Sequence, residues 1–149
     1  MTLTRLLLMI ARSTRAATGF GRGSPRPGRG DARDWIEVEA LALRQKSAEP
    51  LAVVDVRGPD EFVGPPGHIP GSLNIPIGEL ERRLDELSSL RAATVVLVCR
   101  TDKRSAKSLE IMRAQGFANP VVLRGGMERW NALGLETVRD ASDSRPATT

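Results

Sequence analysis

The sequence has very few residues that bind metals or form disulfides. Among 149 residues it holds one cysteine, Cys99, and one histidine, His68. A single cysteine cannot form an internal disulfide, so the fold does not depend on an oxidising compartment and we expect a cytoplasmic protein. Because no cluster of cysteines and histidines exists, we expect no metal site, and no motif calls for a cofactor.

Aromatic residues and long hydrophobic runs are scarce as well. Aromatics make up 3% of the chain and hydrophobic residues 40%, so the core must be built mainly from leucine, valine, isoleucine and alanine. The apolar run Leu3–Ile10 is far shorter than the roughly 20 residues that a membrane helix needs. We therefore expect a globular domain without a stable membrane span.

The formal charge of +4 is concentrated in the first 30 residues, which carry six arginines and no acid. Without these six, the 22 basic residues fall to 16, against 18 acidic residues from Asp31 onward. A body so close to neutrality has no broad positive field to hold a phosphate backbone, so no nucleic-acid partner is expected.

The chain divides into three parts. Residues 1–33 are interpreted as a disordered or targeting leader, because they are rich in arginine, glycine and proline. If this leader is a transit peptide, the protein belongs in an organelle matrix. Residues 34–138 form the predicted domain and the polar residues 139–149 a disordered tail. The sequence does not fix the oligomeric state.

Short apolar segments alternate with amphipathic ones along the domain, which indicates a parallel α/β sheet with helices on both faces. The predicted strands are Leu51–Val56, Ser72–Ile75, Thr94–Val98 and Pro120–Leu123. The predicted helices are Val38–Arg44, Pro59–Val63, Ile77–Leu90, Ser105–Gln115 and Met127–Leu133. In such sheets the functional site lies beyond the carboxyl ends of the strands. This rule points to Asp55 and Arg57 after one strand and to Cys99 after another.

Cys99 lies between a buried strand and a helix, and the loop that follows it is strongly basic. Arg100, Lys103, Arg104 and Lys107 stand against one acid, Asp102. Loop amides, the positive end of the helix and these cations favour a thiolate over a thiol and can hold an anion beside the sulfur. A buried, inert cysteine at a strand end is the alternative.

Four segments in succession resemble the motifs of the single-domain rhodanese family of thiosulfate sulfurtransferases. They are Asp55–Arg57 with Pro59–Phe62, then Gly67–Pro76, then Cys99–Ser105, then Arg124–Trp130. The resemblance covers about 100 residues, from Trp35 to Val138. It implies a rhodanese-like three-layer α/β sandwich with a five-stranded, mainly parallel sheet.

The resemblance also implies a reaction and the residues that perform it. Cys99 would accept a sulfane sulfur from thiosulfate or a persulfide donor and pass it, as a persulfide, to cyanide or a thiol acceptor, a protein thiol included. The substrate cradle would comprise Arg100, Thr101, Asp102, Lys103 and Arg104. The six residues from Cys99 to Arg104 match the loop length of sulfur-transferring members, whereas the related phosphatases and arsenate reductases have one residue more.

Two departures from the family pattern stand out. Asp102 replaces a glycine that many members have, and its carboxylate can either repel an anionic donor or pair with Arg100 or Arg104. The link Gly64–Gly67 is slightly longer than usual, and as a loop we expect it to matter little to the chemistry.

Several other residues have a structural and a functional interpretation. Asp55 and Arg57 can bind substrate, but a support for neighbouring loops through a salt bridge is favoured. His68 is the only histidine and can be a base for Cys99, although its surroundings resemble a structural turn. Gly125 and Gly126 are interpreted as a tight turn with close backbone packing.

Two further classes of function stay open besides the sulfurtransferase. Some rhodanese-like domains are non-catalytic binding or sensor modules. A phosphatase or arsenate reductase on the same fold is the third hypothesis, and the short loop is its main difficulty.

Overall fold

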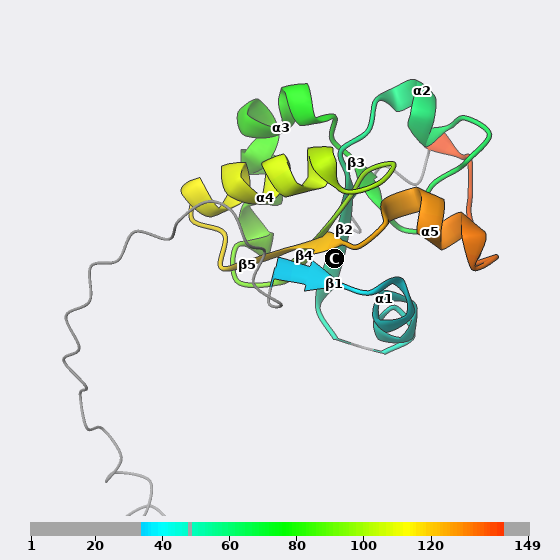
Figure 1. Ribbon diagram of the computed structural model, residues 1–149. Helices are drawn as coiled ribbons and strands as arrows, with labels where there is room; N and C mark the ends of the chain where they lie inside the picture. Colours follow the sequence, from blue (N-terminus) through cyan, green and yellow to red (C-terminus); the bar gives the residue numbers. More distant parts are fainter. Residues whose placement is uncertain (1–33, 48, 142–149) are drawn as a thin grey trace, which may run out of the picture.

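The computed structural model describes residues 34–47 and 49–141. The predicted leader and most of the predicted tail, residues 142–149, lie outside this range. One sheet of five strands runs through the domain in the order β1-β5-β4-β2-β3, and every neighbouring pair is parallel (Figure 1). The strands are β1 (Trp35–Ile36), β2 (Leu51–Asp55), β3 (Leu73–Asn74), β4 (Thr94–Val98) and β5 (Asn119–Leu123). The predicted five-stranded parallel α/β sandwich is therefore confirmed.

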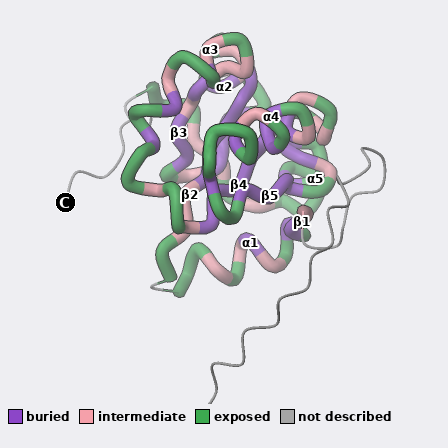
Figure 2. Tube along the Cα trace, turned by 90° about the vertical axis from the view of Figure 1, so that its left-hand side faces the viewer, coloured by how far each residue is buried: buried purple, intermediate pink, exposed green. Residues whose placement is uncertain are grey.

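Helices cover both faces of the sheet. Their bounds are α1 (Val38–Arg44), α2 (Pro59–Phe62), α3 (Ile77–Arg83), the 3₁₀ helix η3 (Leu84–Leu90), α4 (Lys103–Ala114) and α5 (Gly126–Ala132). Side chains of α3, η3 and α4 share one hydrophobic cluster with the sheet, and those of α1 and α5 share another. Figure 2 shows the strands buried in the middle and the outer sides of the helices exposed. None of the helices in these ranges is long and apolar enough to cross a membrane.

Strand β4 is the centre of the domain. All five of its residues are buried. Val95 and Leu97 belong to the cluster under α3 and α4, whereas Val96 and Val98 belong to the cluster under α1 and α5. Both faces of the strand are covered, which is why its sequence is a continuous apolar run and not an alternation of apolar and polar residues.

The bounds of several elements shift by one or two residues from the prediction, among them α4, which begins at Lys103 and not at Ser105. Two elements differ more. The sheet edge β1 pairs through Trp35 with Val122 and through Ile36 with Leu123, and two residues are too short to leave a recognisable pattern. The predicted helix Ile77–Leu90 divides at Leu84 into an α-helix and a 3₁₀ helix. Leucines 84, 87 and 90 repeat every three residues, which matches the three residues per turn of a 3₁₀ helix and keeps them against the core.

The parallel pairing of β2 with β4 brings the two predicted site regions together. Asp55 pairs with Val98 in the register of these strands, and the Val56 amide donates to the Val98 carbonyl at 2.8 Å. The residues that follow β2 and the cysteine that follows β4 therefore lie side by side at the carboxyl edge of the sheet.

Candidate active site

Cys99 follows β4 directly and lies at the base of the site. Its side chain is 1% exposed and belongs to the hydrophobic cluster beneath α4. Burial alone agrees with an inert cysteine as well as with a nucleophile at the bottom of a cradle. The backbone of the following loop bears on the choice between the two interpretations.

The carbonyl groups of this loop are held by the first turn of α5. The Met127 amide donates to the Cys99 carbonyl at 2.9 Å, and the Glu128 amide donates to the Arg100 carbonyl at 3.0 Å. Gly126 makes this contact possible, because a Cβ atom there would lie 2.4 Å from the Cys99 oxygen and 2.3 Å from the Thr101 oxygen. The predicted close packing of the Gly125-Gly126 turn is confirmed.

The amide groups of the same loop are left without acceptors. Over the described ranges, none of the backbone N–H groups from Arg100 to Ser105 donates to a protein atom, and the first amide of this stretch that does is that of Ala106, to Asp102. The last of these groups form the open N-terminus of α4, where four amides lack intrahelical partners. A run of free amides after a strand and before a helix is an arrangement that binds anions.

Arg104, in the first turn of α4 where the Cys99 loop ends, is paired with Glu61 of α2. Its guanidinium donates two hydrogen bonds to the Glu61 carboxylate, at 2.7 and 3.0 Å. Glu61 also accepts the amide of Gly58 at 3.1 Å. The hydrogen bonds from Arg104, and next the Gly58 amide, lower the pKa of Glu61 to about 2, while Glu61 raises the pKa of Arg104.

Arg100 is paired on the opposite side of the loop. Its Nε donates to Oε1 of Glu128 in α5 at 2.8 Å, and both side chains are largely exposed. Two carboxylates distant in sequence thus balance two of the four loop cations. Asp102 pairs with neither arginine, so of the two alternatives for its carboxylate the structure does not bear out the pairing with Arg100 or Arg104. Its carboxylate lies at the start of α4 without a hydrogen bond to the helix amides.

Asp55 and Arg57 form a buried ion pair below the loop. Both are 1% exposed, and Nη2 of Arg57 lies 2.7 Å from Oδ2 of Asp55. The same Nη2 donates to the Gly67 carbonyl at 2.7 Å, and Asn74 donates to the carbonyls of Asp55 and Arg57 at 3.1 and 2.9 Å. This arrangement ties the ends of β2 and β3 to the 64–67 loop, and Arg57 also contributes to the lining of the pocket beside the Cys99 loop.

His68 occupies a structural position. Its ring stacks on Phe62 with centroids 3.5 Å apart, and Nδ1 donates to the Phe62 carbonyl at 2.7 Å. Its backbone exchanges two hydrogen bonds with Val138. A ring fixed in this way is an anchor for α2 and not a base beside Cys99. No three His, Cys, Asp or Glu side chains of the described segments gather as a metal site.

A pocket of about 680 Å³ opens beside the loop. Arg100, Met127 and Glu128 form one side of its lining, and Pro65 and Pro66 contribute to the rest. The 64–67 link therefore lines the volume next to the site, while its small effect on the chemistry stays a prediction. Pro65 and Pro66 form an apolar part of the pocket wall, because a proline exposes only carbon atoms and a carbonyl group.

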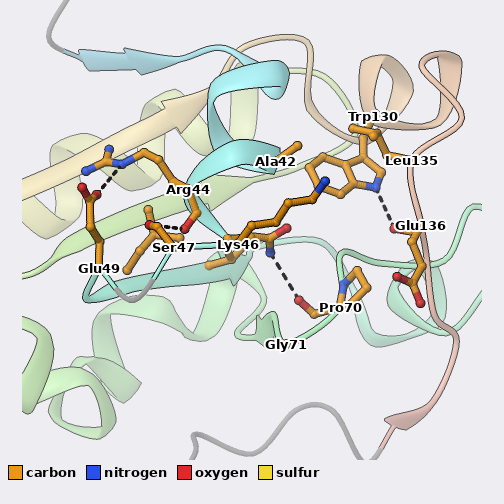
Figure 3. Close-up of a pocket in the computed structure, with 13 residues that line it drawn as sticks. Ala42, Arg44, Lys46, Ser47, Glu49, Pro70, Gly71, Trp130, Leu135 and Glu136 are labelled. Carbon is orange, nitrogen blue, oxygen red and sulfur yellow. Dashed lines mark hydrogen bonds and ion pairs between the residues drawn. The ribbon is translucent and has the colours of Figure 1, made fainter.

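A second pocket, of about 580 Å³, lies between the C-terminal end of α1 and α5 (Figure 3). Leu51, Pro70 and Trp130 line it, and the indole Nε1 of Trp130 donates to the Glu136 carbonyl at 2.9 Å. None of the predicted site residues lines this pocket. The structure therefore brings the predicted residues together around Cys99 and leaves the second pocket outside the site.

A comparison with protein families finds a match over the described domain. The model of the rhodanese-like domain matches residues 37–133, which is most of the chain. The protein belongs to the rhodanese-like domain family.

Similar proteins show the same domain alone and inside longer chains. A sulfurtransferase of Allochromatium vinosum is 33% identical over 69% of this chain and 92% of that protein. An HTH-type transcriptional regulator of Mycobacterium tuberculosis is 47% identical over 71% of this chain but only 45% of that protein. The chain likewise spans about half of two other curated relatives, 49% and 51% of their lengths. The crystal structure of a rhodanese-related protein from Thermoplasma volcanium superposes with a TM-score of 0.62 at 31% identity, over 70% of this chain and 97% of that one.

Sequence reasoning missed three residues that shape the site. Glu61 and Glu128 hold the two loop arginines from 43 and 28 residues away, and Asn74 joins β3 to the residues after β2. Both glutamates lie in segments that carry the family resemblance, which was the one available signal for them. No spacing rule connects them to the loop.

Proposed function

We propose that this protein is a sulfurtransferase that carries sulfane sulfur on Cys99. The observation that carries the proposal is the cradle: six successive amides, from Arg100 to Ser105, have no acceptor in the described protein and follow directly on the only cysteine. Such a cradle stabilises a negative charge on or next to the sulfur. An inert structural cysteine has no need of it.

In the first step the Cys99 thiolate attacks the outer sulfur of thiosulfate. A sulfur–sulfur bond forms to Cys99, and the sulfur–sulfur bond of thiosulfate breaks. Sulfite leaves with the bonding electron pair, so Cys99 becomes a persulfide anion and no external oxidant is needed. The amides of Arg100, Thr101, Asp102, Lys103 and Arg104 stabilise that anion. The ammonium of Lys103, which has no ion pair among the described residues, attracts the donor.

In the second step an acceptor attacks the outer sulfur of the persulfide. The new bond forms to the carbon of cyanide or the sulfur of a thiolate, and Cys99 leaves with the electron pair as a thiolate. Since the chain holds one cysteine, the acceptor must come from outside. We infer that it enters through the pocket lined by Pro65, Pro66 and Met127, whose apolar wall suits the body of a small thiol or a cysteine on another protein.

The arginines play a positioning role in this proposal. Glu61 and Glu128 hold Arg104 and Arg100 at the two sides of the loop. Their charge is partly balanced, so the loop binds a doubly charged donor loosely enough to release the anionic product. The backbone amides, which carry no net charge, then supply most of the stabilisation at the sulfur.

Steady-state transfer from thiosulfate to cyanide, followed as thiocyanate, tests the proposal. We expect transfer by the wild type with parallel double-reciprocal plots, as for a covalent intermediate, and none by Cys99→Ser. Glu110→Gln, a change on the exposed outer side of α4, is the matched control and should leave the rate unchanged. Equal activity of Cys99→Ser and the wild type would refute the proposal.

A sensor module is the second candidate function. The observation in its favour is the 47% identity to a region of a transcriptional regulator that is more than twice as long as the match. The two candidates differ in turnover: an enzyme releases thiocyanate many times per cysteine, whereas a sensor takes up one sulfur and keeps it. Hydrolysis of an aryl phosphate without sulfur transfer would instead indicate the phosphatase reaction.

A further inference from the structure

Ser105 holds a buried hydroxyl group that no part of the fold explains. The residue is 0% exposed, and its Oγ has no hydrogen-bond partner in the part of the chain that the structure describes. One turn further along α4, Ser108 donates to the Arg104 carbonyl at 2.8 Å, which is the usual way for a helical serine to satisfy its hydroxyl. A buried hydroxyl without a hydrogen-bond partner destabilises a fold, so a serine at this position needs an explanation.

The position of Ser105 on α4 places its side chain on the buried face of the helix, near the end of the loop from Cys99. The buried residues of this helix are Ser105, Ser108, Leu109 and Met112, a spacing that places them on one face. Leu109 and Met112 belong to the same hydrophobic cluster as Cys99, so this face is turned towards the sheet. Ser105 lies at the N-terminal end of the face, where the loop from Cys99 enters the helix.

We propose that the Ser105 hydroxyl donates a hydrogen bond to the charged sulfur that Cys99 carries during the reaction, as thiolate and as persulfide. The inference rests on the proposed function, because it needs an anionic sulfur at Cys99. The Cys99 sulfur is not a partner of this hydroxyl in the structure, so the hydroxyl turns to it, by rotation about the Cα–Cβ and Cβ–Oγ bonds, when an anion forms in the cradle. The proton stays on Ser105, which acts as a donor and not as an acid.

Packing alone does not account for a serine at this position. An alanine would fill nearly the same volume and would leave no unpartnered oxygen in the core. The serine hydroxyl adds a side-chain donor to the six amides of the loop, and a hydrogen bond to a charged group is worth more than one between neutral groups. Ser105 is therefore a residue that favours the charged state of Cys99.

Ser105→Ala tests the inference, with Ser72→Ala as the matched control. Ser72 is also fully buried, and its hydroxyl also lacks a partner, but it precedes β3 on another part of the sheet. The first readout is the rate of Cys99 alkylation by iodoacetamide as a function of pH. We expect the midpoint of this profile to move to higher pH in Ser105→Ala and to stay in place in Ser72→Ala.

The second readout is the rate of sulfur transfer from thiosulfate to cyanide. Loss of a hydrogen bond to a charged group predicts a rate roughly tenfold to a hundredfold lower in Ser105→Ala, at an unfolding temperature equal to or above that of the wild type. An unchanged alkylation profile in a folded Ser105→Ala protein would overturn the inference. Absence of transfer in the wild type would refute the proposed function instead, and the alkylation profile would still decide the role of Ser105.

Discussion

Glu61 and Arg104 are joined by two hydrogen bonds of 2.7 and 3.0 Å although 43 residues separate them in sequence. This ion pair links α2, which follows the first site strand, to the end of the loop that begins at Cys99. The position of Arg104 over the site thus depends on an element outside the loop. Both side chains are more than one-third exposed, at 36% and 41%, so solvent screens the pair and its effect on stability is modest.

Glu61→Gln should make stability less dependent on pH. The folded pKa of Glu61, about 2, lies below its ordinary value of 4.5. The unfolded state therefore binds more protons between these values, and the contribution of Glu61 is present above pH 4.5 and lost as the pH falls towards 2. We expect Glu61→Gln to cost up to about 1 kcal/mol at pH 7, the usual limit for an exposed pair.

Urea unfolding of Glu61→Gln at pH 7 and pH 3 measures this effect. The difference in the free energy of unfolding between Glu61→Gln and the wild type should be smaller at pH 3 than at pH 7. Glu110→Gln, on the exposed outer side of α4 and with no partner for its carboxylate among the described residues, should show no such change. An equal difference at both pH values would contradict the assigned role of the ion pair.

Gly126→Ala should disturb the loop more than substitution of Gly134, the glycine that follows α5. Its φ of +54° is costly for alanine, and the added Cβ would lie within 2.8 Å of three loop carbonyl oxygens. We expect a loss of stability of about 3 kcal/mol or more together with loss of transfer activity.

Gly134→Ala separates the cost of the positive φ from the cost of crowding by the added Cβ. Gly134 follows the same helix with a φ of +66°, but a Cβ there meets no atom within 4 Å. It should cost only the backbone strain, about 1–2 kcal/mol, and leave transfer intact. Thermal unfolding of both variants gives the comparison, and equal losses would show that the crowding at Gly126 is unimportant.

Asp55→Asn should destabilise the fold strongly. The substitution leaves the Arg57 guanidinium buried without its counter-charge, and breaking a buried pair in this way costs about 3–5 kcal/mol. Glu86→Gln, which breaks the exposed pair with Arg83, should cost less than about 1 kcal/mol. Chemical unfolding of the two variants checks the contrast. A mild effect of Asp55→Asn would argue against a supporting role for the buried pair.

Asp102→Asn should improve the use of anionic donors. The Asp102 carboxylate has no ion pair among the described residues and lies within the cradle loop. Its charge therefore opposes thiosulfate and is only partly screened by salt. We expect kcat/KM for thiosulfate to rise several-fold, with a larger gain at low ionic strength, and no change in Asp85→Asn, an exposed site in η3. A lower kcat/KM would show that the carboxylate helps the donor to bind.

The sheet and the position of the candidate nucleophile, Cys99, could be predicted from local patterns. The buried run of β4 ends at Cys99, a basic loop follows, and the rule that parallel strands place their sites at the carboxyl edge joined Asp55 to Cys99. Each of these signals lies within a few residues of the feature that it predicts. The two-residue strand β1 gave no such signal.

The charge balance of the site could not be predicted in the same way. A count along the loop gives four cations and one acid, but the fold adds Glu61 and Glu128 from α2 and α5. Which side chains meet across such distances depends on how the helices pack, and Asp102 shows that the nearest acid in sequence need not be the partner. The sequence likewise gives no signal that Pro65 and Pro66 line the pocket, because this depends on where the loops lie in the fold.

Intact-mass spectrometry after incubation with thiosulfate tests the role of Cys99 most directly. The account predicts one added sulfur atom on the wild type, removed again by cyanide, and none on Cys99→Ser. An unchanged wild-type mass, or the same added sulfur on Cys99→Ser, would contradict it.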